Sequence, residues 1–143
     1  MSFNVLVVDD SMSMRAVIKK IITLSGFQMD KCLEASNGRQ GLELLADNWV
    51  DVILSDINMP EMNGLQFLEE LAKNETLREI PVIMITTEGS GERMEEAFKR
   101  GAKGFIKKPF LPEQIRKVLY DVIGVGENGR YEEDPRNTDE LDF

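Results

Sequence analysis

The chain has 143 residues, of which 42% are hydrophobic, and this is enough for a single domain with a sizeable core. Its formal net charge of −9 argues against nucleic acid or an anionic membrane surface as the main partner. The sequence has no histidine, which excludes Ser-His-Asp and Cys-His catalysis and histidine-ligated metal sites, and its single cysteine, Cys32, excludes an internal disulfide. Since it also lacks a signal peptide and a membrane-spanning apolar run, we expect a cytoplasmic protein that does not insert into a membrane.

Five strand-like runs follow one another along the chain. Three of them, the first, third and fourth, are continuous apolar runs, which are typical of strands covered on both faces of a parallel sheet. The second run is polar and alternating, and this pattern favours a position at the edge of the sheet. The predicted strands are Val5–Val8, Gln28–Glu34, Val52–Ser55, Val82–Thr86 and Gly104–Ile106.

Amphipathic stretches lie between and after these runs, with apolar residues at close to the helical spacing of i, i+3, i+4 and i+7. Gly26 follows the first stretch and Gly101 the fourth, as glycines do at helix C-termini. The apolar positions of the five predicted helices are Met14, Val17, Ile18, Ile21 and Leu24; Leu42, Leu45 and Ala46; Leu65, Leu68 and Leu71; Met94, Ala97 and Phe98; and Ile115, Val118, Leu119 and Val122.

The regular alternation of strands and helices predicts an α/β domain, a doubly wound parallel sheet with right-handed crossovers and helices on both faces. We expect this domain to span residues 1–124. Residues 125–143, the acidic tail, hold seven acidic and two basic side chains and few apolar ones, a composition that predicts a disordered or loosely docked segment. Its last five residues, Asp139 to Phe143, form an acidic-hydrophobic pattern. We favour a solubilising tail over a short docking peptide.

Polar and charged side chains follow four of the predicted strands directly. They are Asp9 and Asp10, Asp56, Thr86 and Thr87, and Lys107 and Lys108. Ligands of doubly wound sheets bind beyond the carboxyl ends of the strands, so we expect three carboxylates, a hydroxyl and an ammonium group to converge on one rim. Neighbouring carboxylates repel, but a hard divalent cation relieves the repulsion, and Mg²⁺ prefers oxygen ligands. The sequence therefore predicts a Mg²⁺ site.

Each of these residues also has a purely structural interpretation. Acids after a strand often cap the next helix or occupy its first turn, and Ser11 or Ser13 is an alternative cap. Taken singly, Asp56 would be a loop acid and Lys108 a solvated lysine. Their coincidence at the ends of four strands favours a shared functional site.

The order and spacing of four motifs at these strand ends resemble those of response-regulator receiver domains, the phospho-acceptor domains of two-component signalling. The motifs are VDD (residues 8–10), SDINMP (55–60) with Gly64, ITTE (85–88) and KPF (108–110). The resemblance covers residues 3–124 and implies a flavodoxin-like sheet in the order 2-1-3-4-5, of which chemotaxis receivers are themselves a standard example. It also implies a cis peptide bond between Lys108 and Pro109.

The resemblance further implies a role for each residue of the metal site. Asp56 aligns with the aspartate that accepts a phosphoryl group from a histidine kinase and also binds Mg²⁺. Asp10 aligns with a direct Mg²⁺ ligand, and Asp9 with an acid that acts on the metal mostly through water. Asn58 aligns with the residue whose backbone carbonyl completes the metal site.

The resemblance also implies a switch. Thr86 aligns with the hydroxyl that moves onto the phosphoryl group, Lys108 with the lysine that pairs with it, and Phe105 with a switch aromatic that is usually tyrosine. Asn58 and Glu88 occupy the positions that tune dephosphorylation. These roles imply a phospho-acceptor with self-catalysed phosphorylation and dephosphorylation rather than an enzyme, and an output target on the face of the fourth helix, fifth strand and fifth helix. A phosphatase partner remains open.

Within the family the chain most resembles the stand-alone chemotaxis regulators, since no DNA-binding or catalytic domain follows residue 124. A phosphorelay intermediate or a regulator of a non-motility system is the nearest alternative. An aspartate-nucleophile phosphatase is disfavoured because it needs a general-acid aspartate where Asn58 stands. A flavodoxin-like electron carrier is disfavoured because its phosphate loop is neutral and glycine-rich, whereas DDSMSM is acidic and lacks glycine.

Overall fold

A computed structural model describes residues 2–87 and 91–124 of the chain, so Glu88 and the acidic tail lie outside the described residues. Five parallel strands form one sheet in the order β2-β1-β3-β4-β5, which confirms the predicted fold class and strand order. The strands are β1 (Phe3–Val8), β2 (Met29–Ala35), β3 (Val52–Ser55), β4 (Val82–Thr86) and β5 (Gly104–Lys107).

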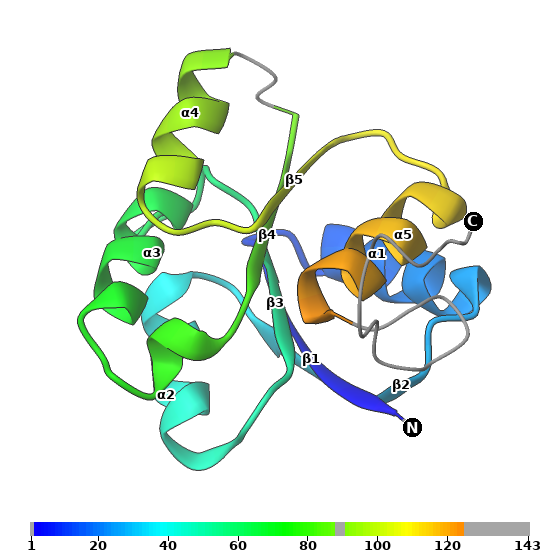
Figure 1. Ribbon diagram of the computed structural model, residues 1–143, viewed down its shortest axis with the longest axis horizontal. Helices are drawn as coiled ribbons and strands as arrows, with labels where there is room; N and C mark the ends of the chain where they lie inside the picture. The colour runs from blue at the N-terminus through cyan, green and yellow to red at the C-terminus, as the bar shows by residue number, and fades with distance from the viewer. Residues whose placement is uncertain (1, 88–90, 125–143) are drawn as a thin grey trace.

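Helices cover both faces of this sheet. Figure 1 shows α1 and α5 on one face and α2, α3 and α4 on the other. No helix of the described residues is long and apolar enough to cross a bilayer. The helices are α1 (Met12–Ser25), α2 (Gly38–Asp47), α3 (Gly64–Ala72), α4 (Gly91–Lys99) and α5 (Pro112–Ile123), with a short 3-10 helix, η1 (Leu77–Glu79), before β4.

The hydrophobic core has two layers, one on each side of the sheet. Successive residues of a strand point to opposite faces, so β1 contributes Leu6 and Val8 to the layer under α2–α4, and Val5 and Val7 to the layer under α1 and α5. All four of these side chains are at most 1% exposed. The continuous apolar run of β1 is therefore explained by burial on both faces.

The predicted strand limits agree closely with the structure. β3 and β4 have the predicted bounds, while β1 begins two residues earlier, β2 is shifted by one residue and β5 ends one residue later. Differences of this size are usual at element ends, where pairing frays. The prediction of a strand at the sheet edge is confirmed for β2, which pairs with β1 alone.

The predicted inward face of α1 is partly wrong. Val17 and Leu24 are 46% and 67% exposed, whereas Ile22, which the pattern did not include, is fully buried beside Ile18. The helix has apolar residues all round, so two stripes one position apart fit the same spacing. Packing against the sheet and α5 selects the stripe of Ile18 and Ile22.

Candidate functional site

The ends of β1 and β3 bring three carboxylates together. These strands pair in register up to Val8 and Ser55, and the Asp56 N–H then donates to the Val8 carbonyl at 2.9 Å. One carboxylate oxygen from each of Asp9, Asp10 and Asp56 lies within 4.8 Å of the other two. Among the described residues this is the sole group of three or more acids, cysteines or histidines placed to hold a metal ion.

Asp9 is the most tightly held member of the cluster. The residue is 2% exposed, and its Oδ1 accepts a hydrogen bond from the Ser11 N–H at 2.9 Å. Ser11 is the N-cap of α1, as one interpretation of the sequence expected, and its hydroxyl accepts from the Met14 N–H. The start of α1 therefore fixes the position of the buried carboxylate.

Arg15 supports the same strand end, a role that the sequence did not predict. Its Nη1 donates to the Asp9 carbonyl at 2.6 Å, and its Nε pairs with Glu34 of β2 at 2.9 Å. Arg15 thereby ties the beginning of α1 to the ends of β1 and β2. The sequence gives one hint of this role, because Arg15 is the first basic residue after the acid pair.

Lys108 faces the carboxylates from the loop after β5. Its Nζ lies 3.1 Å from Asp9 Oδ2 and 3.6 Å from Asp56 Oδ2, and its side chain is 10% exposed. Its backbone N–H donates to the Thr86 carbonyl at 2.9 Å, and the Lys108–Pro109 bond is cis, as expected. Lys107 is exposed to solvent. Three carboxylates and one ammonium group carry a net charge of −2, which suits a divalent cation.

The loop after Asp56 is shaped by Gly64, the first residue of α3. Asp56 Oδ1 accepts from the Ile57 N–H at 2.7 Å, and the Gly64 N–H donates to the Ile57 carbonyl at 2.8 Å. A Cβ at Gly64 would overlap the Asp56 carbonyl and lie 2.9 Å from Ile57 Cα and 2.7 Å from Met84 Cε. A side chain at this position would therefore displace the backbone that carries Asp56.

The other predicted site residues lie around this cluster. Thr86 is fully buried at the end of β4, opposite Lys107 in the register, while the Asn58 side chain is exposed in the β3–α3 loop. Phe105 lies deeper, opposite Met84, and is partly buried against the core layer under α2–α4. Glu88 lies outside the described residues.

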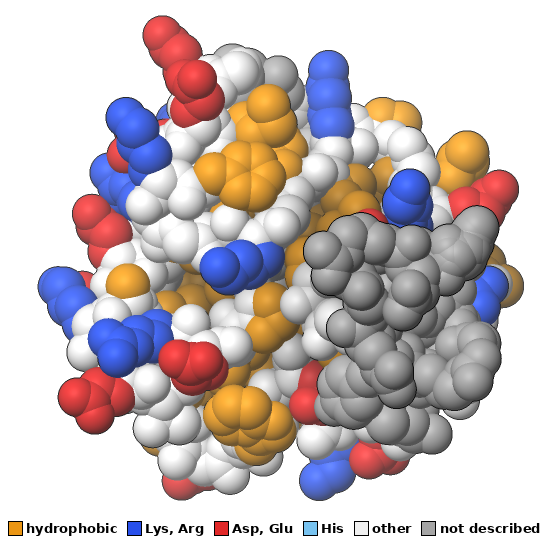
Figure 2. Space-filling model, in the orientation of Figure 1, with side chains coloured by type: hydrophobic (Ala, Val, Ile, Leu, Met, Phe, Trp, Pro, Cys, Tyr) orange, Lys and Arg blue, Asp and Glu red, His pale blue; other side chains and the backbone are white. Residues whose placement is uncertain are grey.

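An apolar surface lies on α4, on the face of the sheet to which Phe105 contributes. Met94 and Phe98 are 40% and 45% exposed, whereas Ala97 between them is fully buried. They line a shallow hollow of about 450 Å³ together with Glu95 and Lys99. Figure 2 shows hydrophobic side chains gathered over α4. This is the helix on which the sequence placed part of the output face.

Cys32 offers no competing chemistry. It lies half-buried in β2, and burial raises the pKa of its thiol above the ordinary value. Nearby Lys19 lowers this pKa and Glu34 raises it, but burial is the largest effect. The thiol is therefore protonated near neutral pH, whereas the nucleophile of a cysteine site is the thiolate.

The chain is similar to known proteins in both sequence and structure. A model of the response regulator receiver domain matches residues 5–120. The chemotaxis protein CheY homolog of Campylobacter jejuni is 42% identical over 86% of this chain and 94% of its own length. Chemotaxis protein CheY1 of Helicobacter pylori is 41% identical over 87% and 99%. The solved structure of chemotaxis protein CheY4 of Vibrio cholerae, 35% identical, covers 85% of this chain and 99% of its own with a TM-score of 0.76.

These similarities cover the same strands and helices that build the site. The match to the family model runs from Val5 of β1 to Tyr120 of α5, and therefore includes Asp9, Asp56 and Lys108. Receiver domains are phospho-acceptor switches, which take a phosphoryl group from histidine kinases on an aspartate and act on downstream targets. The chain belongs to the response regulator receiver domain family and is closely related to the chemotaxis regulators within it.

Proposed function

We propose that Asp56 accepts a phosphoryl group from the phosphohistidine of a histidine kinase, and that this modification switches partner binding in chemotaxis signalling. The observation that carries the proposal is the position of Asp56 at the end of a buried central strand, with its Oδ2 3.6 Å from Lys108 Nζ. The relatives named above support the chemotaxis output, since they are chemotaxis proteins and the chain aligns with nearly their whole length.

The transfer is a substitution at phosphorus. A carboxylate oxygen of Asp56 forms a new P–O bond while the P–N bond of phosphohistidine breaks and its electron pair returns to the imidazole. Negative charge spreads over the equatorial phosphoryl oxygens during transfer, and the Lys108 ammonium group is close enough to stabilise it. The Ile57 N–H meanwhile holds the other carboxylate oxygen in place. Hydrolysis of the acyl phosphate at the same site reverses the switch.

Magnesium is the cofactor that this donor set fits best. The cluster offers only oxygen ligands, carries a net charge of −2 with Lys108, and includes Asp9, which is 2% exposed. Asp10 and Asp56 would hold the ion directly, Asp9 through water, and Asn58 through its backbone carbonyl. Bound Mg²⁺ would supply positive charge at the cluster, so that the carboxylates would not repel the incoming donor.

The switch that we propose passes from Thr86 to the surface of α4. The phosphoryl group adds charge and strong acceptor oxygens at the end of β4, where Thr86 provides a hydroxyl. If Thr86 moves towards the phosphoryl group, Phe105 can turn into the space behind it and change the surface around Met94 and Phe98. Asn58 and Glu88 then tune how long the phosphoryl group persists.

Intact-mass measurement after incubation with acetyl phosphate tests the proposal. The wild-type chain with Mg²⁺ should gain one phosphoryl group, whereas Asp56→Asn, or the wild type in excess chelator, should gain none. Asp30→Asn, which changes an exposed aspartate on β2, is the matched control and should behave as wild type. An adduct that persists in Asp56→Asn would show that another residue is the acceptor.

A further inference from the structure

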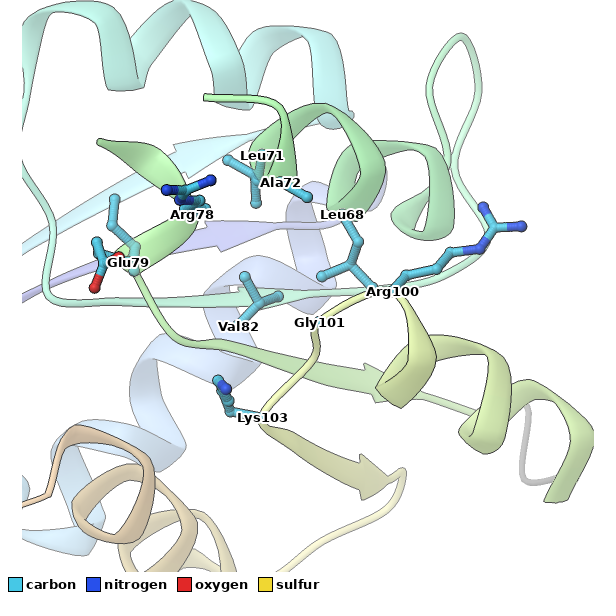
Figure 3. A pocket seen from close by; sticks show the side chains of 10 residues that line it. Leu68, Leu71, Ala72, Arg78, Glu79, Val82, Arg100, Gly101 and Lys103 are labelled. Carbon is cyan, nitrogen blue, oxygen red and sulfur yellow. The ribbon is translucent and has the colours of Figure 1, made fainter. Parts of the chain in front are cut away.

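A hollow with basic side chains at its edge lies at the opposite end of the sheet from the rim. It opens between α3, η1 and the starts of β4 and β5, and its volume is about 340 Å³. Figure 3 shows it from close by. We call it the strand-start hollow; its apolar lining includes Leu68, Leu71 and Val82, and its basic edge consists of Arg78, Arg100 and Lys103.

Two of the three cations at this edge are available to a partner. Arg100 is engaged in ion pairs with glutamates of α3 and α4, at 3.1 and 2.8 Å. Within residues 2–87 and 91–124, neither the Arg78 nor the Lys103 side chain has a hydrogen bond or an ion pair. Glu79 is the one acid among the lining residues. Arg78 and Lys103 therefore present two positive charges against one lining acid, beside an apolar lining, in a chain whose net charge is −9.

The acidic tail begins at the same end of the sheet as this hollow, although α5 itself covers the opposite face. Helix α5 ends at Ile123, and its last turn packs on the start of β5, since a Cβ at Gly104 would lie 3.5 Å from Val122 Cγ1. Lys103, at the edge of the hollow, is the residue before Gly104. The tail therefore leaves the domain at the sheet end where the hollow opens.

The tail is long enough and has the right chemistry to enter the hollow. Fourteen residues connect Gly124 to the Asp139–Phe143 pattern and span up to about 50 Å when extended, against a radius of gyration of about 14 Å for a domain of this size. The pattern contains three acids together with Leu141 and Phe143. The acids of the pattern can pair with Arg78 and Lys103, and its apolar side chains can pack against the apolar lining of the hollow.

We propose that the acidic tail docks intramolecularly in the strand-start hollow. Its acids lie against Arg78 and Lys103, and Leu141 or Phe143 rests on the apolar lining. Ion pairs between exposed groups are individually weak, so the contact depends on the high effective concentration that tethering provides and is reversible and salt-sensitive. Because Arg100 joins α4 to α3 at this hollow, a docked tail braces the end of the helix that presents Met94 and Phe98.

Paramagnetic relaxation in the full chain tests this contact directly. A nitroxide is attached at Asn137→Cys in a Cys32→Ser background, and amide signals are compared with the label oxidised and reduced. We expect broadening of the amides of residues 77–82 and 100–104 several-fold greater than that of β2, and its loss in 1 M salt. Changes in the same amides between wild type and Leu141→Ser/Phe143→Ser, with Cys32 intact, give an independent readout.

Charge reversal supplies the matched variants. Arg78→Glu/Lys103→Glu should abolish the broadening, and Lys31→Glu/Arg39→Glu, an equal charge change at exposed cations elsewhere, should leave it intact. Adding lysines at Asp139, Glu140 and Asp142 to the first variant should restore it. Uniform broadening, broadening centred on another surface, or broadening of an unlabelled chain by a labelled second copy would each overturn the proposal.

Discussion

The two ends of the sheet carry charged side chains in opposite ways. At the rim, Asp9 and Lys108 are nearly buried and lie 3.1 Å apart. Asp9 accepts a hydrogen bond from the Ser11 N–H at the start of α1, and the Lys108 N–H donates one to the Thr86 carbonyl of β4. At the strand-start hollow, Arg78 and Lys103 are exposed around an apolar lining. Buried charges interact strongly because little water screens them, and exposed ones interact weakly. Changes at the rim should therefore abolish a function, whereas changes at the hollow should be graded and salt-dependent.

The topology accounts for this difference. In a parallel sheet all strands end at the same edge, so the loops after β1, β3, β4 and β5 converge, and buried strands deliver Asp9 and Asp56 directly to that edge. The returning helices end at the other edge, where loops such as that between α4 and β5 lie at the surface. The loops that converge after the strands form the chemical site, whereas the loops that lead from the helices back to the strands form an open surface.

The largest effect on the rim should come from Gly64→Ala. The added Cβ would overlap the Asp56 carbonyl. We therefore expect the free energy of unfolding to fall by about 1–3 kcal/mol and phosphorylation of Asp56 to be nearly lost. Gly91→Ala is the control, because a Cβ there would meet no atom of the described residues within 4 Å, and the stability of this variant should be unchanged or slightly raised. Urea denaturation measures the stability of each variant, and intact mass after incubation with acetyl phosphate measures its phosphorylation. Equal stability of the two variants would contradict the close-packing argument.

Next in size is the contrast between two adjacent lysines. Lys108→Ala should leave the fold intact but uncouple phosphorylation from output, because the ammonium group beside Asp56 is gone. Lys107→Ala should behave as wild type, since this neighbouring side chain is exposed to solvent and is not among the groups at the carboxylates. Circular dichroism and amide shifts of α4 with and without beryllofluoride separate fold from output. If Lys107→Ala is the more damaging change, the wrong lysine has been assigned to the site.

A smaller and graded effect is expected where the rim connects to α4. Thr86→Ala should reduce the response of α4 amides to beryllofluoride, because the hydroxyl that meets the phosphoryl group is absent. Phe105→Tyr should lower the basal population of the active arrangement, because a tyrosine hydroxyl is costly to bury and phenylalanine has none. The positions of α4 amide signals without beryllofluoride measure this population. An unchanged response in Thr86→Ala would rule out the coupling between Thr86 and α4. Unchanged basal signal positions in Phe105→Tyr would rule out that the missing hydroxyl of Phe105 favours the active arrangement.

Much of the fold and the cluster was predictable because β1, β3 and β4 are short apolar runs that end in polar residues. For strands buried on both faces, composition alone marks their limits, and Val52–Ser55 and Val82–Thr86 were predicted with their observed bounds. The positions of Asp9, Asp10 and Asp56 then follow from topology, and their grouping within 4.8 Å agrees with the expected convergence.

What escaped prediction depends on packing between elements distant in sequence. The inward stripe of α1 is decided by the sheet and α5, so the sequence did not distinguish Ile22 from Val17. The contact of Arg15 with the Asp9 carbonyl requires the start of α1 to be placed against two strands. The strand-start hollow likewise brings together Arg78 of η1 and Lys103 of the α4–β5 loop, which β4 and α4 separate in the sequence. Such features carry no local periodicity.

The smallest effect should follow removal of the acidic tail, which we propose to dock at the end of the sheet opposite the rim. Its ion pairs at the hollow would join exposed groups, and such pairs contribute less than about 1 kcal/mol each. A chain ending at residue 126 should therefore melt within about 4 °C of the full chain and be phosphorylated at Asp56 at the same rate. The small difference should shrink further in 1 M salt, where charges are screened beyond about 3 Å. A fall of about 10 °C or more would instead mean that the tail packs on the domain as part of its core, and the two ends of the sheet would then not differ as argued.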